Sequence, residues 1–476
     1  MCIRDRVKMC GVIGVVSKSN DTINEAIDLL NAENNRGEQA CGGAAFDGKR
    51  IRCYRGKGLV AKVFDDENYE KWSKLKGSAC IAHTLYSTIG RGGEKKQPQM
   101  FQPIIFNFHG RRGALAHNGN LVRLEKLREK AKRAGYKFQS ESSDTEVISA
   151  LLSIAPEKDF LEALKGVLKQ IEDKGAFSLV ILYKDKIIGV RDSNGVRPLC
   201  LGKRNGEVDS YILASEDSVF SALKSARLVR EIAPGEIIVL GGDGIEKSFR
   251  WSDKVSSKFC VCELIYFANP ATTFFRRSVY SFRAKAGEIT AKEHPVKVDI
   301  IVPVPNSGND YSDGFSSQSG IPTRRGIVKS KYARRTFMQA RDVDRGKTQR
   351  RALRVLPDVL GDKDSCLTED SLFRGNVAKA VVSLVRIHGK AREVHLRVCS
   401  PPVRYCCHLG LDTSTKEELL ATHMTTDEIR DKIVHSDSLE YLSLEGLKEA
   451  LRQAGLSPDD FCLGCFTGEY PVLPPT

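Results

Sequence analysis

At 476 residues the chain is too long for one ordinary hydrophobic core, so two domains of two hundred or more residues are expected. Apolar residues make up 41% and charged residues 28%, as in a soluble globular protein, and no apolar run reaches the ~18 residues of a membrane span. The net charge of +14 raises the question of nucleic acid. The basic cluster at 324–354 has no nucleic-acid-binding signature and few aromatic residues, so a phosphate-rich small substrate explains it as well, and neither nucleic acid nor a membrane is expected as a partner.

The chain begins with a short segment that does not resemble a targeting signal. Residues 1–8 lack the apolar core of a signal peptide, so residues 1–9 are interpreted as either a short pro-segment or an incorrectly assigned start. Fourteen cysteines without a secretion signal argue against a disulfide framework and for catalytic or metal-binding roles. A cytoplasmic location is therefore expected.

The first half of the chain alternates short β-branched strands with amphipathic helices. Turn dipeptides, Pro234-Gly235 and Asp243-Gly244, follow near its end, which predicts a domain junction between residues 244 and 257. The domains are accordingly expected at 10–250 and 251–476. The predicted elements of the first half are helices at 23–31 and 121–134 and strands at 177–182 and 236–240.

The second half repeats the order of strand and then helix. This order predicts an α/β domain with a parallel sheet whose site lies at the carboxyl ends of the strands. The predicted elements are strands at 298–304, 365–367 and 394–398 and a helix at 377–388.

Cys10 stands directly after a possible start methionine and before a β-branched run with two glycines. If the residues before it are removed, it becomes the first residue of a buried strand. A thiol next to its own free α-amine combines a nucleophile with a base, because an α-amine titrates at about 7.7–8.0 and can accept the thiol proton. The alternative is a small apolar residue in a core strand.

Further motifs follow along the first half. Asn118-Gly119, placed after a predicted strand, offers an amide side chain and an unencumbered backbone N–H, the two donors that an oxyanion hole needs. Asp144 precedes a helical run at 147–152 and either holds an ammonium group or caps the helix. Two other motifs lie at 36–42 and 83–88.

In this order the motifs resemble the class II glutamine amidotransferase domain, an α+β N-terminal-nucleophile fold of two stacked sheets between helices. The resemblance covers roughly residues 10–240. It implies that Cys10 takes the glutamine acyl group and releases ammonia, and that Asn118 and Gly119 stabilise the oxyanion. The glutamine-binding residues it implies are Asp144, for the α-ammonium group, and Arg36 and Gly42 of the family's Arg-Gly-Gln loop.

One position of the first half departs from this family. Where the family has Thr-Arg-Tyr, this chain has Thr84-Leu85-Tyr86. The family's arginine grips the glutamine carboxylate in a bidentate pair, and leucine makes no such contact. Either Arg91 or Arg36 replaces that arginine, or glutamine binds weakly and the enzyme depends on free ammonia.

The stretch 366–376 has the form of a strand, two acids, a small-residue loop and a helix start. A helix N-terminus with free N–H groups is an anion site, and Glu369 and Asp370 before it can bind sugar hydroxyls and Mg²⁺. Paired acids before a loop are also frequent as a solvated helix cap. The stretch resembles the phosphoribosyl-pyrophosphate (PRPP) loop of type I phosphoribosyltransferases.

Surrounding segments extend the resemblance to nearly the whole chain, from 10 to 470. They are similar to the amidophosphoribosyltransferase family, the glutamine-dependent enzymes that open purine synthesis. The implied reaction is displacement of pyrophosphate from PRPP by ammonia made at Cys10, which gives 5-phosphoribosylamine. The segments are 263–268, 278–283, 302–308, 329–337 and 400–404.

The resemblance also implies roles for residues of the second domain. Glu369 and Asp370 would hold the ribose hydroxyls and Mg²⁺, with Ser307 near the metal. The basic stretch at 329–350 would close over the pyrophosphate, neutralise the leaving group and exclude water. The phosphate-binding residues implied are Ser371, Arg374, Gly375 and Asn376, and those near the pyrophosphate are Lys329, Tyr332, Arg335 and Arg350.

Several residues of the second site differ from the family pattern, so weaker PRPP binding is expected. Glu369 replaces an aspartate, and Asn376-Val377 stands where two threonines are typical, which removes hydroxyl donors to the phosphate. The further replacements are Asn306 for aspartate, Arg334 for glycine and Ala352 for lysine.

The cysteines of the second half suggest a metal site. Cys462 and Cys465 form a Cys-x-x-Cys pair, which by itself is compatible with zinc, a redox pair or an iron–sulfur cluster. Cys262 is an additional thiol, and Cys406 sits where one branch of the family has proline, so exchange of a ligand is an alternative. That branch binds a [4Fe–4S] cluster, and its cysteine positions correspond to Cys260, Cys407, Cys462 and Cys465.

The resemblance implies glutamine and PRPP as substrates, purine nucleotides as feedback inhibitors, and a homo-oligomer of closed symmetry, a dimer or a tetramer. Two alternatives to a glutamine-dependent enzyme stay open. Leu85 suggests a phosphoribosyltransferase that uses only free ammonia. The residues Asn306, Glu369 and Asn376 suggest a non-catalytic sensor of PRPP or a nucleotide.

Overall fold

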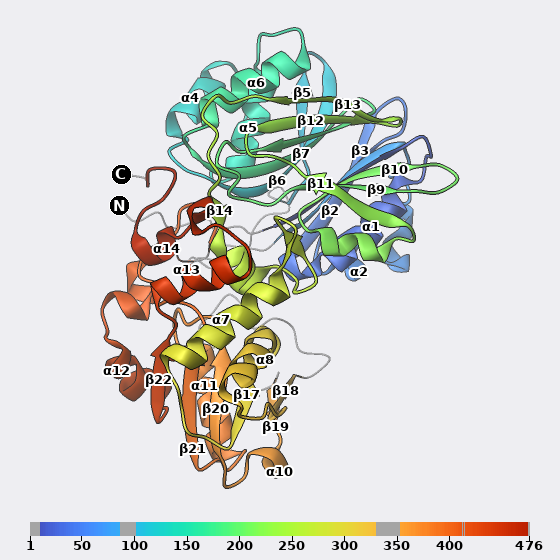
Figure 1. Cartoon of the computed structure of the whole chain (residues 1–476). Coiled ribbons are helices and arrows are strands. Elements are labelled where there is room, and N and C mark those ends of the chain that lie inside the picture. Colours follow the sequence, from blue (N-terminus) through green and yellow to red (C-terminus); the bar gives the residue numbers. More distant parts are fainter. Residues whose placement is uncertain (1–9, 86–100, 330–352, 412, 414, 475–476) are drawn as a thin grey trace.

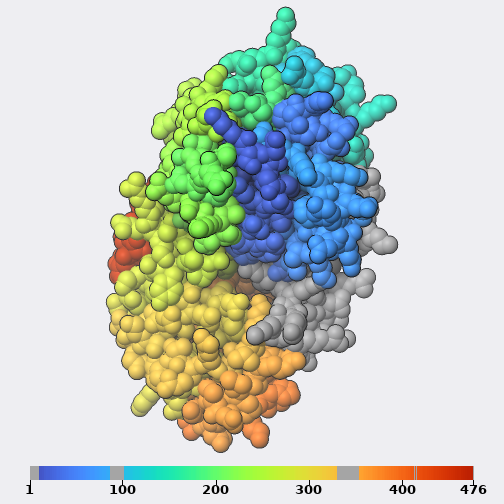
Figure 2. Space-filling view, turned by 90° about the vertical axis from the view of Figure 1, so that its right-hand side faces the viewer, coloured from blue at the N-terminus to red at the C-terminus, as the bar shows by residue number. Residues whose placement is uncertain are grey.

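The computed structural model describes residues 10–85, 101–329, 353–411, 413 and 415–474. The first half of the chain forms the upper part of the molecule and the second half the lower part, as Figure 1 and the side view in Figure 2 show. Among the described residues, no helix is long and apolar enough to cross a membrane.

A seven-stranded antiparallel sheet opens the first half, in the order β11-β9-β10-β1-β4-β2-β3. Strand β1 lies in its middle, and all of its residues are buried because both faces of the sheet are covered. The strands are β1 (Gly11–Ser17), β2 (Ala40–Phe46), β3 (Ile51–Lys57), β4 (Ala79–Leu85), β9 (Cys200–Arg204), β10 (Ser210–Ala214) and β11 (Ala226–Glu231).

A second antiparallel sheet of six strands, in the order β13-β12-β8-β7-β6-β5, packs against the first. Alternate residues of the facing strands form a shared apolar layer, in which Val12 and Val16 of β1 lie with Val180 and Leu182 of β7. The strands are β5 (Ile104–Phe108), β6 (Arg111–Leu121), β7 (Gly175–Tyr183), β8 (Lys186–Arg191), β12 (Glu236–Gly241) and β13 (Gly244–Arg250).

Helices cover the outer face of each sheet, which completes the predicted arrangement of stacked sheets between helices. Helix α1 (Thr22–Ala32) packs its apolar side on the seven-stranded sheet, while α5 (Asp144–Ser153) and α6 (Phe160–Ile171) pack on the six-stranded sheet. Shorter helical segments connect the strands: η1 (Asn34–Arg36), α2 (Val60–Val63), η2 (Asp66–Asn68), α3 (Tyr69–Trp72), α4 (Glu125–Arg133) and η4 (Asp217–Ala222).

The second half contains the predicted parallel sheet, in the order β17-β20-β21-β22. Helices α7 and α8 pack closely against each other, because Gly287 and Gly314 let their backbones approach. The elements of the sheet and its main helices are α7 (Val279–Glu293), β17 (Ile300–Pro303), α8 (Gly308–Ser319), β20 (Asp364–Glu369), α11 (Asn376–Ile387), β21 (Glu393–Val398), β22 (Ser438–Tyr441) and α13 (Leu444–Gln453).

The C-terminal tail returns to the level at which the two halves meet. Strand β23 (Phe461–Cys462) pairs in parallel with β14 (Phe259–Cys260), and Figure 1 shows α13 and α14 (Gly464–Thr467) beside β14. The remaining short elements are η5 (Glu263–Phe267), β15 (Thr273–Phe274), β16 (Arg277–Ser278), β18 (Ile327–Lys329), β19 (Leu353–Val355), α10 (Pro357–Leu360), η7 (Lys416–Glu418), η8 (Leu420–Thr422), α12 (Thr426–Ile429), η9 (Arg430–Val434) and η10 (Pro458–Asp460).

Most of the predicted elements are confirmed to within a few residues, but one expectation was wrong in detail. The helix expected at 121–134 begins only at Glu125, because pairing with β7 extends β6 to Leu121. The last strand of the six-stranded sheet, β13 (Gly244–Arg250), ends within the interval 244–257 in which the domain junction is predicted.

Candidate active site

Cys10 lies fully buried at the start of β1. Its backbone nitrogen donates a hydrogen bond of 3.1 Å to Oδ1 of Asn118, which belongs to β6 of the opposite sheet. The contact joins residues 108 positions apart in the chain. The two stacked sheets therefore bring together the residue predicted as nucleophile and the residue predicted to hold the oxyanion.

Asn118 has the free donor that an oxyanion hole requires. Its oxygen is engaged by Cys10, whereas its Nδ2 group is buried and has no hydrogen-bond partner among the described residues. A buried donor without a partner costs about 1–3 kcal/mol, so such a group is expected where a ligand supplies the acceptor.

Gly119 follows within the same strand. The sequence had suggested that the Asn118-Gly119 dipeptide follows a strand. The structure instead places it inside β6. At its φ of +148° a side chain would be strained, and a Cβ atom would collide with the carbonyl of Ala176. A glycine is therefore required beside Asn118.

Asp144 is the first residue of α5, but it does not cap the helix. The cap is Ser143, whose Oγ accepts a hydrogen bond of 3.1 Å from the backbone nitrogen of Glu146. The fully buried carboxylate of Asp144 instead accepts a hydrogen bond of 3.2 Å from the backbone nitrogen of Leu121, at the end of β6. The carboxylate therefore lies beside Leu121, which is three positions beyond Asn118 in β6.

Arg36 contacts the nucleophile residue, but not in the predicted way. Its Nε donates to the carbonyl oxygen of Cys10 at 3.0 Å, its Nη1 to Glu216 at 2.7 Å, and its two Nη groups to both oxygens of Glu263 at 3.0 Å. Burial by itself lowers the pKa of Arg36, but the carboxylates of Glu263 and Glu216 outweigh it and raise that pKa.

Every nitrogen of the Arg36 guanidinium is thus engaged within the protein. The expectation that Arg36 binds the glutamine carboxylate is accordingly corrected: its guanidinium binds the carbonyl oxygen of Cys10 instead. The alternative cation, Arg91, lies outside the described residues. Gly42 lies in β2, opposite His83 of β4.

Leu85 lies next to Cys10. It is 3% exposed and packs in a small apolar cluster with Cys10, Ala40 and Phe101. The position at which a carboxylate-binding arginine would stand is therefore apolar and in contact with the nucleophile residue.

Replacing Leu85 by arginine is expected to strengthen glutamine binding, because a guanidinium at this position can form a bidentate pair with a carboxylate. A charge-assisted pair is worth about 1.5–3 kcal/mol, so KM for glutamine should fall by roughly tenfold or more. Steady-state kinetics at varied glutamine measures the change. Leu85→Met is the matched control, since it keeps the apolar contact and should leave KM unchanged. An unaltered KM in the arginine variant would contradict the expectation.

In the second half, Glu369 ends β20 and Asp370 follows it, so both acids lie at the carboxyl end of a central parallel strand. Both residues are largely buried, at 7% and 8% exposure. Burial, and then the neighbouring Asp370 carboxylate, raise the pKa of Glu369 well above its usual range. Oε2 of Glu369 has no hydrogen-bond partner among the described residues. Two crowded carboxylates with an unused oxygen suit a cation or sugar hydroxyls better than a solvated cap.

The loop after these acids leads directly into α11. Ser371 hydrogen-bonds to Asp370, Gly375 takes a positive φ of +71° at the helix N-cap, and Asn376 is the first helical residue. The free N–H groups of the first turn of α11 therefore face the same loop. Arg374 instead forms an ion pair of 2.6 Å with Glu418 of η7.

The other predicted residues of this site lie on neighbouring elements. Ser307 is the N-cap of α8. Thr368 Oγ1 donates a hydrogen bond of 3.2 Å to the carbonyl oxygen of Gly308, the first residue of that helix. Lys329 ends β18. The remaining predicted residues, Tyr332, Arg335 and Arg350, lie outside the described residues, as do residues 1–9.

The predicted cysteine ligands gather where the C-terminal tail meets the junction. Cys260 pairs in register with Cys462, and Sγ of Cys262 lies 3.8 Å from Sγ of Cys465. Cys407 packs against the same apolar cluster, and the thiols influence one another electrostatically. Among the described residues, however, no three potential ligands are arranged to hold a metal ion.

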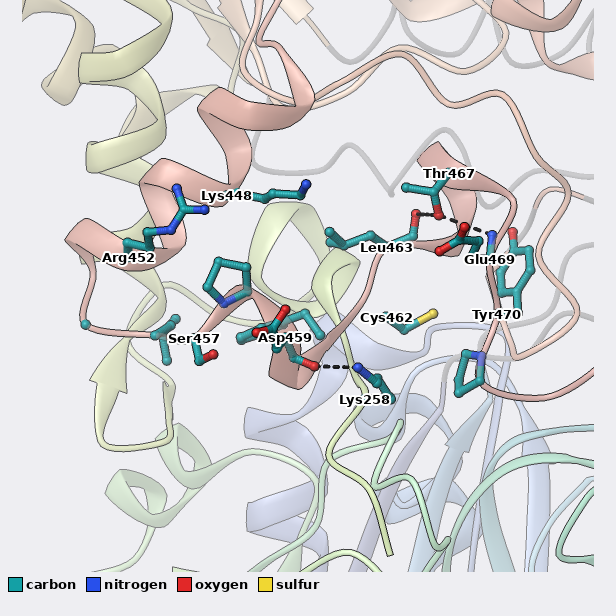
Figure 3. A pocket seen from close by; sticks show the side chains of 15 residues that line it. Lys258, Lys448, Arg452, Ser457, Asp459, Cys462, Leu463, Thr467, Glu469 and Tyr470 are labelled. Carbon is teal, nitrogen blue, oxygen red and sulfur yellow. Dashed lines mark hydrogen bonds between the residues drawn. The ribbon is translucent and has the colours of Figure 1, made fainter.

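A cavity of about 860 Å³ opens beside these thiols. Figure 3 shows Cys462 on its wall, between Lys258 and Tyr470. Burial, and then the thiols of Cys407 and Cys465, raise the pKa of Tyr470. The cavity thus reaches the cysteine region from outside.

Sequence reasoning missed four buried residues that organise the surroundings of Cys10 and Asn118: Glu216, Glu263, Arg197 and Asn120. Glu216 and Glu263 lie 180 and 227 residues from Arg36 in the chain. No local pattern marks a residue whose partner is this distant. A buried acid in a segment of otherwise apolar residues, such as Glu263 in η5, was the only available signal.

Comparison with known proteins agrees with this arrangement. A glutamine amidotransferase domain family matches residues 95–222. The chain is 37% identical to the amidophosphoribosyltransferase of Synechococcus elongatus over 98% of its length and 92% of that protein. It is 38% identical to the amidophosphoribosyltransferase of Methanocaldococcus jannaschii, over 98% of each chain.

Solved structures agree as well. The glutamine PRPP amidotransferase of Bacillus subtilis complexed with ADP and GMP superimposes with a TM-score of 0.85 at 33% identity, covering 98% of both chains. A structure described as the allosteric regulatory enzyme of purine biosynthesis gives a TM-score of 0.86 at 34% identity, covering 98% of this chain and 96% of the other. Identity at this level over nearly the whole length establishes the relationship: the chain belongs to the amidophosphoribosyltransferase family.

Proposed function

We propose that this chain is an amidophosphoribosyltransferase that converts PRPP, glutamine and water into 5-phosphoribosylamine, pyrophosphate and glutamate, the first committed step of purine synthesis. The observation that carries the proposal is the contact between Cys10 and Asn118, in a chain that also presents Glu369 and Asp370 before a helix N-terminus. The domains are proposed at 10–250 for the glutaminase and 251–476 for the phosphoribosyltransferase.

The glutaminase half-reaction begins at Cys10 once its α-amine is free. The amine accepts the thiol proton, and the sulfur attacks the side-chain carbonyl carbon of glutamine. Negative charge then develops on the carbonyl oxygen, where Asn118 Nδ2 and the Gly119 N–H donate hydrogen bonds. Ammonia leaves with a proton returned by the amine, and water hydrolyses the thioester to glutamate. Asp144 holds the α-ammonium group of the substrate.

In the second half-reaction ammonia displaces pyrophosphate at the ribose carbon of PRPP. The 5′-phosphate accepts hydrogen bonds from the loop of Ser371, Gly375 and Asn376 and from the first turn of α11. Glu369 and Asp370 bind the ribose hydroxyls, and the basic segment that includes Lys329 neutralises the leaving group. Arg374 joins the phosphate site only if its ion pair with Glu418 opens.

Two inorganic groups are part of the proposal. Glu369 and Asp370 would hold Mg²⁺, with Ser307 nearby; the unpartnered oxygen of Glu369 and the all-oxygen donor set fit this ion. When bound, Mg²⁺ would supply positive charge to offset that of the pyrophosphate. A [4Fe–4S] cluster would be held by Cys260, Cys407, Cys462 and Cys465. In support stand the gathering of these thiols in one region, three of them buried and Cys407 half-buried, and the chemistry of an all-sulfur donor set. Held by these cysteines, the cluster would tie the C-terminal tail to the start and middle of the second domain.

Purine nucleotides are proposed as feedback inhibitors, because the Bacillus subtilis relative is described as complexed with ADP and GMP. A homo-oligomer and a cytoplasmic location are proposed on the family relationship. A second candidate function, an enzyme that uses only free ammonia, is favoured by one observation: the apolar Leu85 occupies the place beside Cys10.

The test uses protein that begins at Cys10, purified without oxygen, and measures PRPP-dependent pyrophosphate release. Turnover with both glutamine and ammonium salt is expected. Turnover with ammonium alone would favour the second candidate, and turnover with neither would favour a nucleotide sensor. Iron content and visible absorbance of the same preparation test the cluster separately; colourless, iron-free protein would contradict it.

A further inference from the structure

The loop 407–411, which carries Cys407, contacts the first domain through two neighbouring carbonyl groups. Asn120 Nδ2 donates a hydrogen bond of 2.8 Å to the carbonyl oxygen of His408. Arg197 Nη2 donates one of 2.8 Å to the carbonyl oxygen of Leu409. Both donors are buried, at 4% and 0% exposure.

The first of these contacts lies at the oxyanion strand. Asn120 directly follows Gly119 in β6, and the next residue, Leu121, donates its backbone N–H to Asp144. The side chain of Asn120 therefore fixes the strand between the proposed oxyanion donors and the proposed carboxylate for the substrate ammonium group. A shift of the loop at His408 would therefore move both the proposed oxyanion donors and the backbone N–H that holds Asp144.

The second contact leads to the nucleophile from the other side. Arg197 Nη1 donates to Glu263 Oε1 at 3.1 Å, and Glu263 holds Arg36 through both oxygens. Arg36 in turn holds the carbonyl oxygen of Cys10. Arg197, Glu263 and Arg36 are all fully buried, so water cannot replace any of these contacts if one of them is broken.

The loop is built to accept these contacts. Gly410 has a φ of +119°, and a Cβ atom there would lie 2.6 Å from Arg197 Nη2, so only glycine lets the guanidinium lie against the loop. The shape of the loop also depends on its cysteine, because the backbone N–H of Leu409 donates to Sγ of Cys407 at 3.3 Å.

We infer that the loop 407–411 of the second domain is a positioning element for the glutaminase site, acting through Asn120 on the oxyanion strand and through Arg197 on the nucleophile. The inference rests on the proposed glutaminase at Cys10. It makes Asn120 and Arg197 positioning residues, since neither takes part in the chemistry. The arrangement couples the glutaminase to the cysteine region, while the PRPP site has no share in these contacts.

The test compares Asn120→Ala with Asn107→Ala in the full chain beginning at Cys10. Asn107 is an exposed asparagine of β5, the strand next to β6, and serves as the matched control. In the first variant kcat/KM for glutamine should fall roughly ten- to hundredfold, as for a lost buried hydrogen bond, while ammonium-dependent turnover stays within about twofold. Amide hydrogen exchange should quicken in both 114–121 and 407–411. Asn107→Ala should change neither kcat/KM for glutamine nor the exchange rates of these two segments.

Gly410→Ala disturbs the same contact from the loop side and should give the same selective loss. An equal fall with glutamine and ammonium in both variants would indicate a structural role and overturn the inference, as would unchanged exchange in both segments. If the unaltered protein shows no glutamine turnover, the proposed glutaminase has failed. Hydrogen exchange then still decides whether the loop orders the strand.

Discussion

Replacing Cys10 by alanine is expected to abolish glutamine-dependent formation of phosphoribosylamine and to spare the ammonium-dependent reaction. The thiol is the only group at this position that can form the acyl intermediate, so the glutamine reaction should fall by about a thousandfold or more. The proposed PRPP site lies in the other half of the chain, on β20 and α11, and keeps its residues. Pyrophosphate release with each nitrogen source measures both outcomes.

The substitution removes one buried sulfur from a small apolar cluster, so its effect on stability must be separated from its effect on chemistry. Cys80→Ala is the matched control, because Cys80 is equally buried in β4, opposite Val15 of β1. It should destabilise the fold slightly and keep glutamine turnover. Retained glutamine turnover in the Cys10 variant would refute the assignment of the nucleophile.

Replacing Asp370 by asparagine is expected to reduce turnover about a hundredfold or more with glutamine and with ammonium alike. The change removes one of two adjacent charges at the end of β20, where a cation and the ribose hydroxyls are proposed to bind. Because both nitrogen sources must react with PRPP, neither can bypass the defect. The same pyrophosphate assay, at varied Mg²⁺ and PRPP, measures it.

Asp358→Asn supplies the control, since Asp358 is exposed on α10 of the same domain and should leave both activities unchanged. The glutaminase half-reaction offers a second comparison, because glutamate release without PRPP does not involve Asp370. A loss confined to the glutamine-dependent reaction would contradict the assignment of Asp370 to the PRPP site.

The two variants are expected to fail in different ways because the proposed sites share no residue. Cys10 and Asn118 meet between two stacked sheets, whereas Glu369 and Asp370 lie at the carboxyl end of a central strand of the parallel sheet. The loop 407–411 belongs with the first pair and not with the second. Variants of Asn120 or Gly410 should therefore resemble a mild form of the Cys10 variant.

Local sequence patterns were sufficient for much of this protein. Short runs of β-branched and other apolar residues predicted β7, β12 and β21, and the run of strand, acids, loop and helix predicted the order of β20 and α11. These patterns are reliable because the determining interactions lie within a few residues of each other. The assignment of Cys10 as nucleophile and Asn118 as oxyanion donor stays a prediction; the structure shows that these two residues are in contact.

What only the tertiary structure decided concerns residues whose partners are distant in the chain. By sequence, Arg36 was a candidate to bind glutamine; the structure engages it with Glu216 and Glu263, each at least 180 positions away. The start of α4 was displaced because pairing with β7 continues β6 through Leu121. Likewise, the hydrogen bond from Asn120 to His408 spans 288 positions. Such contacts form between segments that meet only when the chain has folded. Their physical cause, the pairing of buried polar and charged groups that are distant in the chain, therefore leaves no local pattern in the sequence.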